Sequence, residues 1–127
     1  MKGRGRFSIL KGKSRRGFRG YPLATIAYYG PDATRATKVA VGIIAGEHQE
    51  ASPLERWHSL DLDVRFDQEI CGSIVEFLQA HHVRSVVMSP GIIGCPHQEG
   101  VDYPEGEKCP ACPYWADKDR WTGEVIQ

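Results

Sequence analysis

Residues 67–88 read DQEICGSIVEFLQAHHVRSVVM, and this stretch decides the expected fold. Asp67 can accept hydrogen bonds from the free N–H groups of a first helical turn, so we expect a helix over roughly 67–82. The apolar residues of this segment recur at the spacing of one helical face: Ile70, Ile74, Phe77 and Leu78. Residues 85–88 then form a short apolar run, which favours a buried strand. The pattern predicts an amphipathic helix that covers a sheet.

Two upstream segments predict the other strands of that sheet. Residues 22–29 are apolar and aromatic, and residues 37–45 are apolar with several β-branched side chains. Residues 30–32 (GPD) are a turn signal between them, so we expect a hairpin. Residues 52–55 (SPLE) have the order of an N-cap, a first helical proline and a capping-box carboxylate. They predict a short helix through about Trp57.

These elements predict a small domain of the α+β class, with α/β as the alternative. The expected sheet is a hairpin plus a third strand, covered by one amphipathic helix and followed by a zinc-stapled C-terminal loop. We divide the chain into a basic flexible arm (1–20), a core domain (21–94) and a zinc-binding loop and tail (95–127).

Metal-type residues cluster after the last predicted strand. Cys95-Pro96-His97 offers one pair of candidate ligands, and Cys109-Pro110-Ala111-Cys112 offers a second pair. Zinc takes four sulfur or nitrogen ligands in a tetrahedron, and glycines between the two pairs allow the loop to fold back. Closed sites of this kind are usually structural. We therefore predict a structural Zn²⁺ bound by four residues: Cys95, His97, Cys109 and Cys112.

Other interpretations of this cluster stay open. Cys109 and Cys112 could be a redox dithiol, although the surrounding prolines fit that motif poorly, or thiols that bind nothing. Three residues could replace His97 as a ligand if the fold brings them near: His48, His58 and Asp102. If His97 is not a ligand, Glu99 and Asp102 become candidates for activating water beside an open metal.

Residues 91–115 read GIIGCPHQEGVDYPEGEKCPACPYW. This stretch resembles a group of small uncharacterised bacterial proteins that share GIIGCPH, EG-x-DYP and CP-x-CPYW. The resemblance covers about a fifth of the chain. It implies a zinc-type motif, and it implies no reaction because no activity is known for the group.

The net charge of zero conceals a strong asymmetry. Residues 1–31 hold eight Lys or Arg and no acidic residue, whereas the remainder holds eight basic and sixteen acidic residues. Arginine, glycine and phenylalanine alternate in the arm, which is typical of segments that bind single-stranded or structured RNA or DNA. The expected contacts are Lys2, Arg4, Arg6, Phe7, Lys11, Lys13, Arg15, Arg16, Phe18 and Arg19. The alternative is an acidic protein surface, the chain's own or a partner's.

The sequence thus predicts a non-catalytic, zinc-containing module that binds nucleic acid, within a larger assembly. The first alternative is a protein-interaction or inhibitor-like module, and the second is a zinc-dependent hydrolase that uses the 95–112 site. His58, Asp61 and Asp63 have the spacing of a metal nuclease, but we interpret them as a loop because no second acidic cluster supports them. Without a long apolar run or a signal peptide, we expect a cytoplasmic protein with no membrane partner.

Overall fold

The computed structural model describes residues 6–59, 61–98, 100–107 and 109–115, and it confirms the α+β class. Its elements are α1 (Arg6–Arg15), β1 (Leu23–Tyr29), β2 (Lys38–Ile44), β3 (Leu54–His58), α2 (Gln68–Ala80), β4 (Ser85–Ile92) and the 3₁₀ helix η1 (Pro113–Trp115). The strands form one mixed sheet in the order β3-β2-β1-β4. β1 and β2 are antiparallel, as are β2 and β3, whereas β1 and β4 are parallel. The predicted hairpin over 22–45 is therefore confirmed.

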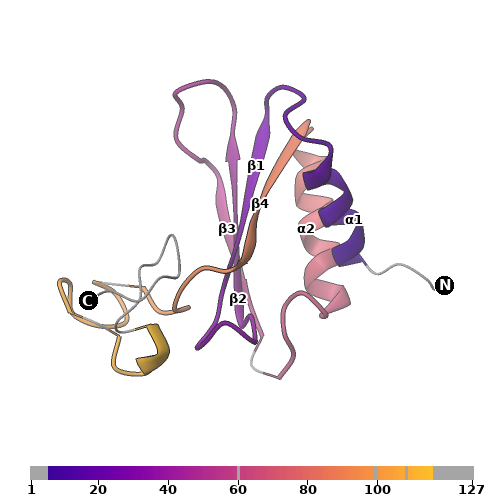
Figure 1. The fold of residues 1–127 in the computed structure, drawn as a ribbon. Coiled ribbons are helices and arrows are strands. Elements are labelled where there is room, and N and C mark those ends of the chain that lie inside the picture. The colour runs from indigo at the N-terminus through magenta and orange to yellow at the C-terminus, as the bar shows by residue number, and fades with distance from the viewer. Residues whose placement is uncertain (1–5, 60, 99, 108, 116–127) are drawn as a thin grey trace.

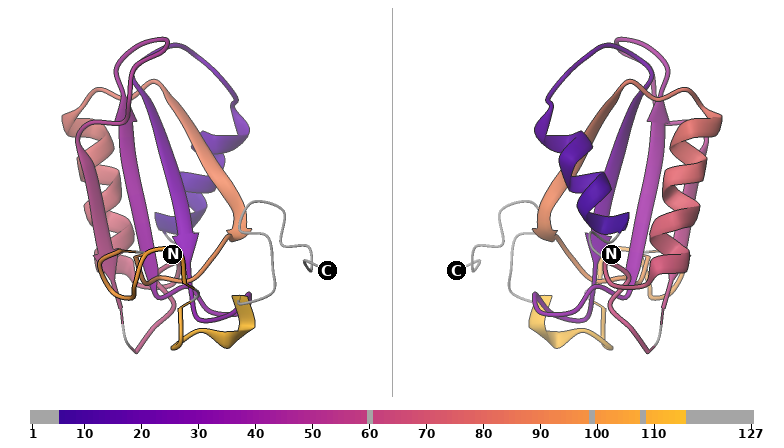
Figure 2. Two further views of the ribbon diagram at one scale, coloured as in Figure 1. Left: turned by 90° about the vertical axis from the view of Figure 1, so that its left-hand side faces the viewer. Right: turned by 90° about the vertical axis from the view of Figure 1, so that its right-hand side faces the viewer.

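Both α-helices lie on one face of the sheet, whereas the C-terminal loop with η1 extends towards the opposite side at one end of the strands (Figures 1 and 2). Side chains alternate along β1, so that Ala24, Ile26 and Tyr28 are buried towards the helices. The core joins these to Val39 and Val41 of β2 and to further buried residues of the helices and β4: Leu10, Ile74, Leu78 and Val86.

The helix predicted over 67–82 is confirmed as α2. Asp67 caps it, with its carboxylate accepting hydrogen bonds from the backbone N–H groups of Glu69 (3.0 Å) and Ile70 (3.1 Å). Ile74 and Leu78 on its apolar stripe are buried against the sheet. The strand after it is longer than expected, because β4 continues to Ile92.

The short helix predicted from Ser52 to about Trp57 is wrong, since residues 54–58 form the edge strand β3. The backbone N–H of Ser52 donates to the carbonyl of Ile43 (2.8 Å), and the N–H of Ile43 donates to the carbonyl of Pro53 (3.1 Å). A one-turn helix is marginal on its own. Pairing with the open edge of β2 therefore outweighs the local capping signal.

The predicted flexible arm contains a helix, because residues 6–15 form α1. Leu10 of α1 is fully buried in the core. The backbone N–H of Arg19 donates to Ser85 Oγ (2.7 Å), and that hydroxyl donates to the carbonyl of Gly20 (2.6 Å). Leu10 and the two hydrogen bonds of Ser85 thus attach the segment 6–20 to the core. The division into arm, core and loop otherwise stays a prediction.

Candidate metal centre and basic surface

The first pair of candidate ligands is positioned by the sheet. After β4, the backbone N–H of Ile93 donates to the carbonyl of Tyr28 (2.9 Å), and the N–H of Gly30 donates to the carbonyl of Gly94 (2.9 Å). These bonds bring Cys95 to the end of β1. Lys38 Nζ of β2 then donates to the carbonyl of Pro96 (3.0 Å). The turn from Cys95 to His97 is therefore held by two strands.

The second pair is held by a turn and by one tryptophan. The N–H of Cys112 donates to the carbonyl of Cys109 (3.4 Å), and the N–H of Trp115 donates to the carbonyl of Cys112 (3.1 Å). The indole Nε1 of Trp115 donates to the carbonyl of Gly30 (2.8 Å), just after β1. The intervening loop reverses at Gly100 (φ 82°) and Gly106 (φ 86°), where positive φ favours glycine.

All four predicted ligands come together. His97 Nδ1 lies 3.2 Å from Cys95 Sγ and 3.4 Å from both Cys109 Sγ and Cys112 Sγ. The four ligand atoms all lie within 4.8 Å of one another. Tetrahedral zinc with ordinary Zn–S and Zn–N bond lengths requires sulfur and nitrogen to be about 3.5 Å apart. The cluster therefore fits a metal ion such as zinc.

The electrostatics of the cluster also suit a cation. Burial raises the pKa of the Cys112 thiol, and the neighbouring Cys95 and Cys109 raise it further. Burial likewise raises the pKa of Cys95, although the backbone N–H of His97 donates to its sulfur (3.3 Å) and opposes that shift. All four cysteines of the chain are free of disulfides. Three crowded thiols become thiolates readily only when a positive ion offsets their charge.

The alternative ligands are not part of this group. Among the described residues, His48, His58 and Asp102 lie outside the one cluster of candidate metal ligands, and Glu99 lies outside the described residues. Asp102 instead accepts a hydrogen bond from the backbone N–H of Gln98 (2.7 Å), which stabilises the loop. In the described chain, His58, Asp61 and Asp63 form no metal-type group either.

The described basic residues of the predicted nucleic-acid contacts lie on α1 or directly after it. Lys11, Lys13 and Arg15 lie on the helix, and Arg16 and Arg19 follow it. Phe18, between these two arginines, is 63% exposed and contacts Tyr21 edge-on. Arg6 and Phe7 begin α1, whereas Lys2 and Arg4 lie outside the described residues.

Two recesses beside α1 are lined by these cations. They are also lined by two arginines that the sequence analysis did not predict as contacts, Arg65 and Arg84. Lys11, Arg15 and Arg65 line one recess, and Lys13, Arg16, Arg19 and Arg84 line the other. Arg65 and Arg84 are isolated in the sequence, and no local motif marks them. They join α1 because β4 pairs with β1 and the chain enters α2 beside Asp63, which binds Arg65.

The chain matches no protein-family model, no curated protein and no solved structure. The resemblance of residues 91–115 to small bacterial proteins therefore identifies no family, and the structure supports its metal-type cluster alone. No helix among the described residues is long and apolar enough to cross a membrane. Function has to be inferred from the geometry of the site.

Proposed function

We propose that this chain is a non-catalytic module that is stabilised by a structural zinc ion and binds nucleic acid through a basic surface beside α1. That basic surface consists of seven side chains: Lys11, Lys13, Arg15, Arg16, Arg19, Arg65 and Arg84. The observation that carries the proposal is that these cations line both recesses, and that no carboxylate is among the described residues that line either one. Such a surface attracts phosphate groups and releases counterions when they bind.

Most of the charges of this surface lie outside the ion pairs of the described chain, whereas Arg65 pairs with Asp63. Lys13, Arg15, Arg16 and Arg19 form no ion pair within the part of the chain that the structure describes, where the ion pairs are Asp63–Arg65 and Glu47–His48. This favours an external polyanion over the chain's own acidic body. The exposed ring of Phe18, which lies between Arg16 and Arg19 in the sequence, favours single strands, whose unstacked bases can stack on it.

The zinc assignment follows from the donor set. Three sulfurs and one imidazole nitrogen are typical of structural zinc sites, and four protein ligands leave no position for a reactive water. The bound ion would cross-link the Cys95–His97 turn to the Cys109–Cys112 turn. This arrangement favours a structural role over a hydrolase at the 95–112 site. Elemental analysis of the reduced, untagged chain should find about one zinc per molecule.

A salt titration tests the nucleic-acid proposal. We expect the full chain to bind a single-stranded oligonucleotide more weakly as salt rises, and the double variant Arg16→Gln, Arg19→Gln to flatten the salt slope by up to about two. The matched control is the double variant Arg35→Gln, Arg56→Gln, which removes two exposed cations outside the basic surface and should change the slope less.

Wild-type protein that binds no strand at about 50 mM salt would contradict the proposal. Stronger competition by polyglutamate than by nucleic acid would favour the protein-docking alternative.

The aromatic contribution can be separated from charge. Phe18→Ala should weaken single-strand binding by roughly 1–3 kcal/mol with little change in salt slope, because stacking releases few counterions. Tyr114→Ala is the control, since Tyr114 is also exposed but lies in η1 of the C-terminal loop, outside the basic surface. Equal effects of the two variants would show that Phe18 does not stack on bases.

A further inference from the structure

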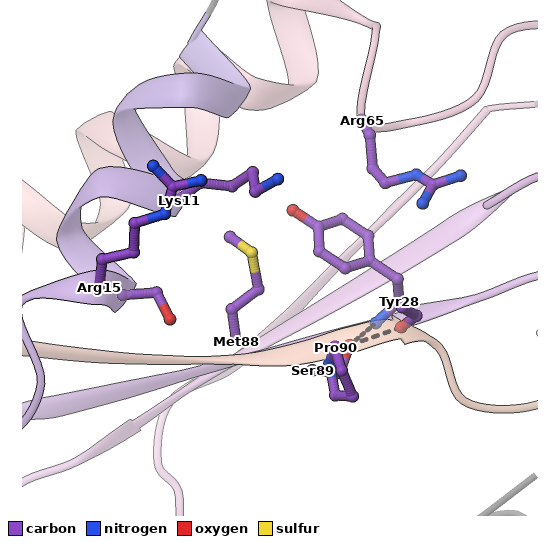
Figure 3. A pocket seen from close by; sticks show the side chains of 9 residues that line it. Lys11, Arg15, Tyr28, Arg65, Met88, Ser89 and Pro90 are labelled. Carbon is purple, nitrogen blue, oxygen red and sulfur yellow. Dashed lines mark hydrogen bonds between the residues drawn. The ribbon is translucent and has the colours of Figure 1, made fainter.

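One of the two recesses has the construction of a small-ligand site. We call it the α1 recess (Figure 3). Its cavity volume is about 280 Å³, close to the lower end for small-molecule sites. Lys11, Ser14 and Arg15 of α1 line one side, Tyr28 of β1 lies below them, and Arg65 and residues 88–91 of β4 complete the lining.

A bulge in β4 contributes to this recess. Ile26 of β1 pairs with Met88 of β4, but Tyr28 pairs with Ile92. Residues 89–91 of β4 therefore lie opposite the single residue Ala27, which defines the bulge. Pro90 in the bulge has no N–H to continue the ladder. Ser89 Oγ instead accepts from the backbone N–H of Tyr28 (3.2 Å) and donates to the carbonyl of Gly91 (2.8 Å). The bulge is thus a hydrogen-bonded part of the fold, and bulges of this kind often adjoin binding sites.

The place of the recess in the sheet is also typical of ligand sites. It lies near the carboxyl ends of the parallel pair β1 and β4. In open sheets with parallel strands, ligands bind in the crevice beyond these ends. The chain runs from β1 through β2 to β3 on one side of β1 and returns to β4 on the other side, so this is where the strand order changes direction.

The lining offers hydrogen-bond donors suited to an anion. Lys11 and Arg15 are four residues apart and therefore share one face of α1. Figure 3 shows the Lys11 side chain and the Tyr28 hydroxyl directed towards each other between α1 and β1. Tyr28 is only 2% exposed, and burial is the main cause that raises the pKa of its phenol. The phenol therefore stays protonated at neutral pH and can donate a hydrogen bond.

The charge of the site distinguishes between anions. The described lining holds three cations and no carboxylate, and Arg65 forms an ion pair with Asp63 (2.6 Å). The other two cations, Lys11 and Arg15, suit a phosphate monoester, which carries about −1.5 to −2 at pH 7. A backbone diester carries one negative charge and has fewer unsubstituted oxygens.

We propose that the α1 recess binds a phosphate monoester, either the terminal phosphate of a strand or the phosphate of a free small molecule. Lys11 and Arg15 bind the phosphate oxygens, and the hydroxyl of Ser14 donates to them. A free phosphorylated molecule can occupy this site without a nucleic-acid strand, so binding of a free molecule does not depend on the proposed function. Binding of the terminal phosphate of a strand does rest on the proposed function.

The test compares one oligonucleotide with a 5′-phosphate or a 5′-hydroxyl, and adds a nucleoside 5′-monophosphate and inorganic phosphate as free probes. We expect the full chain to bind the nucleoside monophosphate at least roughly tenfold more tightly than the unphosphorylated nucleoside. Lys11→Gln should remove this preference.

Lys13→Gln is the matched control, since Lys13 lies on the same helix and carries the same charge but lines the other recess. It should weaken binding of both oligonucleotides alike and leave the monophosphate preference intact. A 5′-phosphate preference in strands identifies the terminal phosphate as the source, whereas a preference for the free monophosphate alone identifies a small molecule. Binding of the monophosphate without any strand binding would retain the site and remove the proposed function. Equal affinity of the wild type for phosphorylated and unphosphorylated probes would overturn the site.

Discussion

The body of the molecule (residues 6–92) and its C-terminal loop (93–115) are held together in different ways. The body buries apolar side chains from both α-helices and from β1, β2 and β4, among them Ile26, Val41 and Ile74. In the described part of the loop, the buried side chains are those of Cys95 and Cys112, both in the candidate metal centre. Burial of apolar area therefore stabilises the body, whereas for the loop we propose stabilisation by metal ligation.

Metal removal is the strongest way to separate the two regions. A chelator under reducing conditions should abolish hydrogen-exchange protection over 93–115, because ordering of structural zinc sites depends on a binding free energy of about 10–16 kcal/mol in zinc-finger peptides. The body should keep its protection. Cys112→Ala should act like the chelator, and Cys71→Ala is the control because that buried thiol lies in α2, outside the cluster. Loss of protection throughout the body would show that the two regions are one cooperative unit.

Leu10→Ala should give the largest effect on the body. Leu10 is fully buried, so truncation should lower the free energy of unfolding by roughly 2–5 kcal/mol while zinc content stays the same. Ile9→Ala on the same helix is the control, since Ile9 is 45% exposed and should change stability by less than about 0.5 kcal/mol. Urea unfolding followed by circular dichroism measures both. Equal, small effects would mean that α1 is not part of the core.

The charge of Asp63 makes the body sensitive to acid. Burial alone would raise the pKa of this carboxyl, but hydrogen bonds from Arg65 and from the backbone N–H of Ala36 outweigh it and lower the pKa. Stability from this group is therefore present above the unfolded pKa of about 3.9 and is lost as pH falls through the lower folded pKa.

Asp63→Asn should accordingly lower the free energy of unfolding by about 1–3 kcal/mol at pH 7 and have less effect at pH 2–3. Asp61→Asn is the control, because Asp61 is exposed. Unfolding curves at both pH values measure the difference. An Asn variant as stable as wild type at pH 7 would contradict a stabilising role for the ion pair.

The smallest effect should come from the hydrogen bond that joins the two regions. Trp115→Phe removes the bond from the indole N–H to the carbonyl of Gly30, which is worth about 0.5–1.5 kcal/mol. We expect zinc to bind up to roughly tenfold more weakly and the body to unfold as before. Trp57→Phe is the converse control, since Trp57 packs on Phe77 in the body. Competition with a chromogenic chelator reports zinc affinity, and unchanged affinity in Trp115→Phe would show that the bond is dispensable.

Features with local signals could be predicted from the sequence. Asp67 and the apolar stripe after it predicted α2, the turn at residues 30–32 predicted the hairpin, and the cysteine spacing predicted the four clustered ligands. Each of these depends on residues close together in the chain. The nucleic-acid and zinc assignments stay predictions that the experiments above address.

Features that depend on distant pairing could not be predicted. β3 carries a helix-type capping sequence, and its strand conformation depends on the open edge of β2. α1 is mostly polar and is anchored in the core through Leu10, so its sequence resembled a free arm. Arg65 and Arg84 reach α1 only once β4 has paired with β1. The α1 recess depends on that pairing as well.

The bulge in β4 has a second consequence, for self-association. β3 and β4 are the two edges of the described sheet, and unpaired edge strands can recruit strands of other copies into aggregates. β3 is short and exposes the charges of Glu55 and Arg56. β4 places Pro90 and an interrupted ladder at the other edge. The charges and short length of β3 thus make it a poor partner for strands of other copies. Pro90 in the bulge makes β4 a poor template for fibril growth.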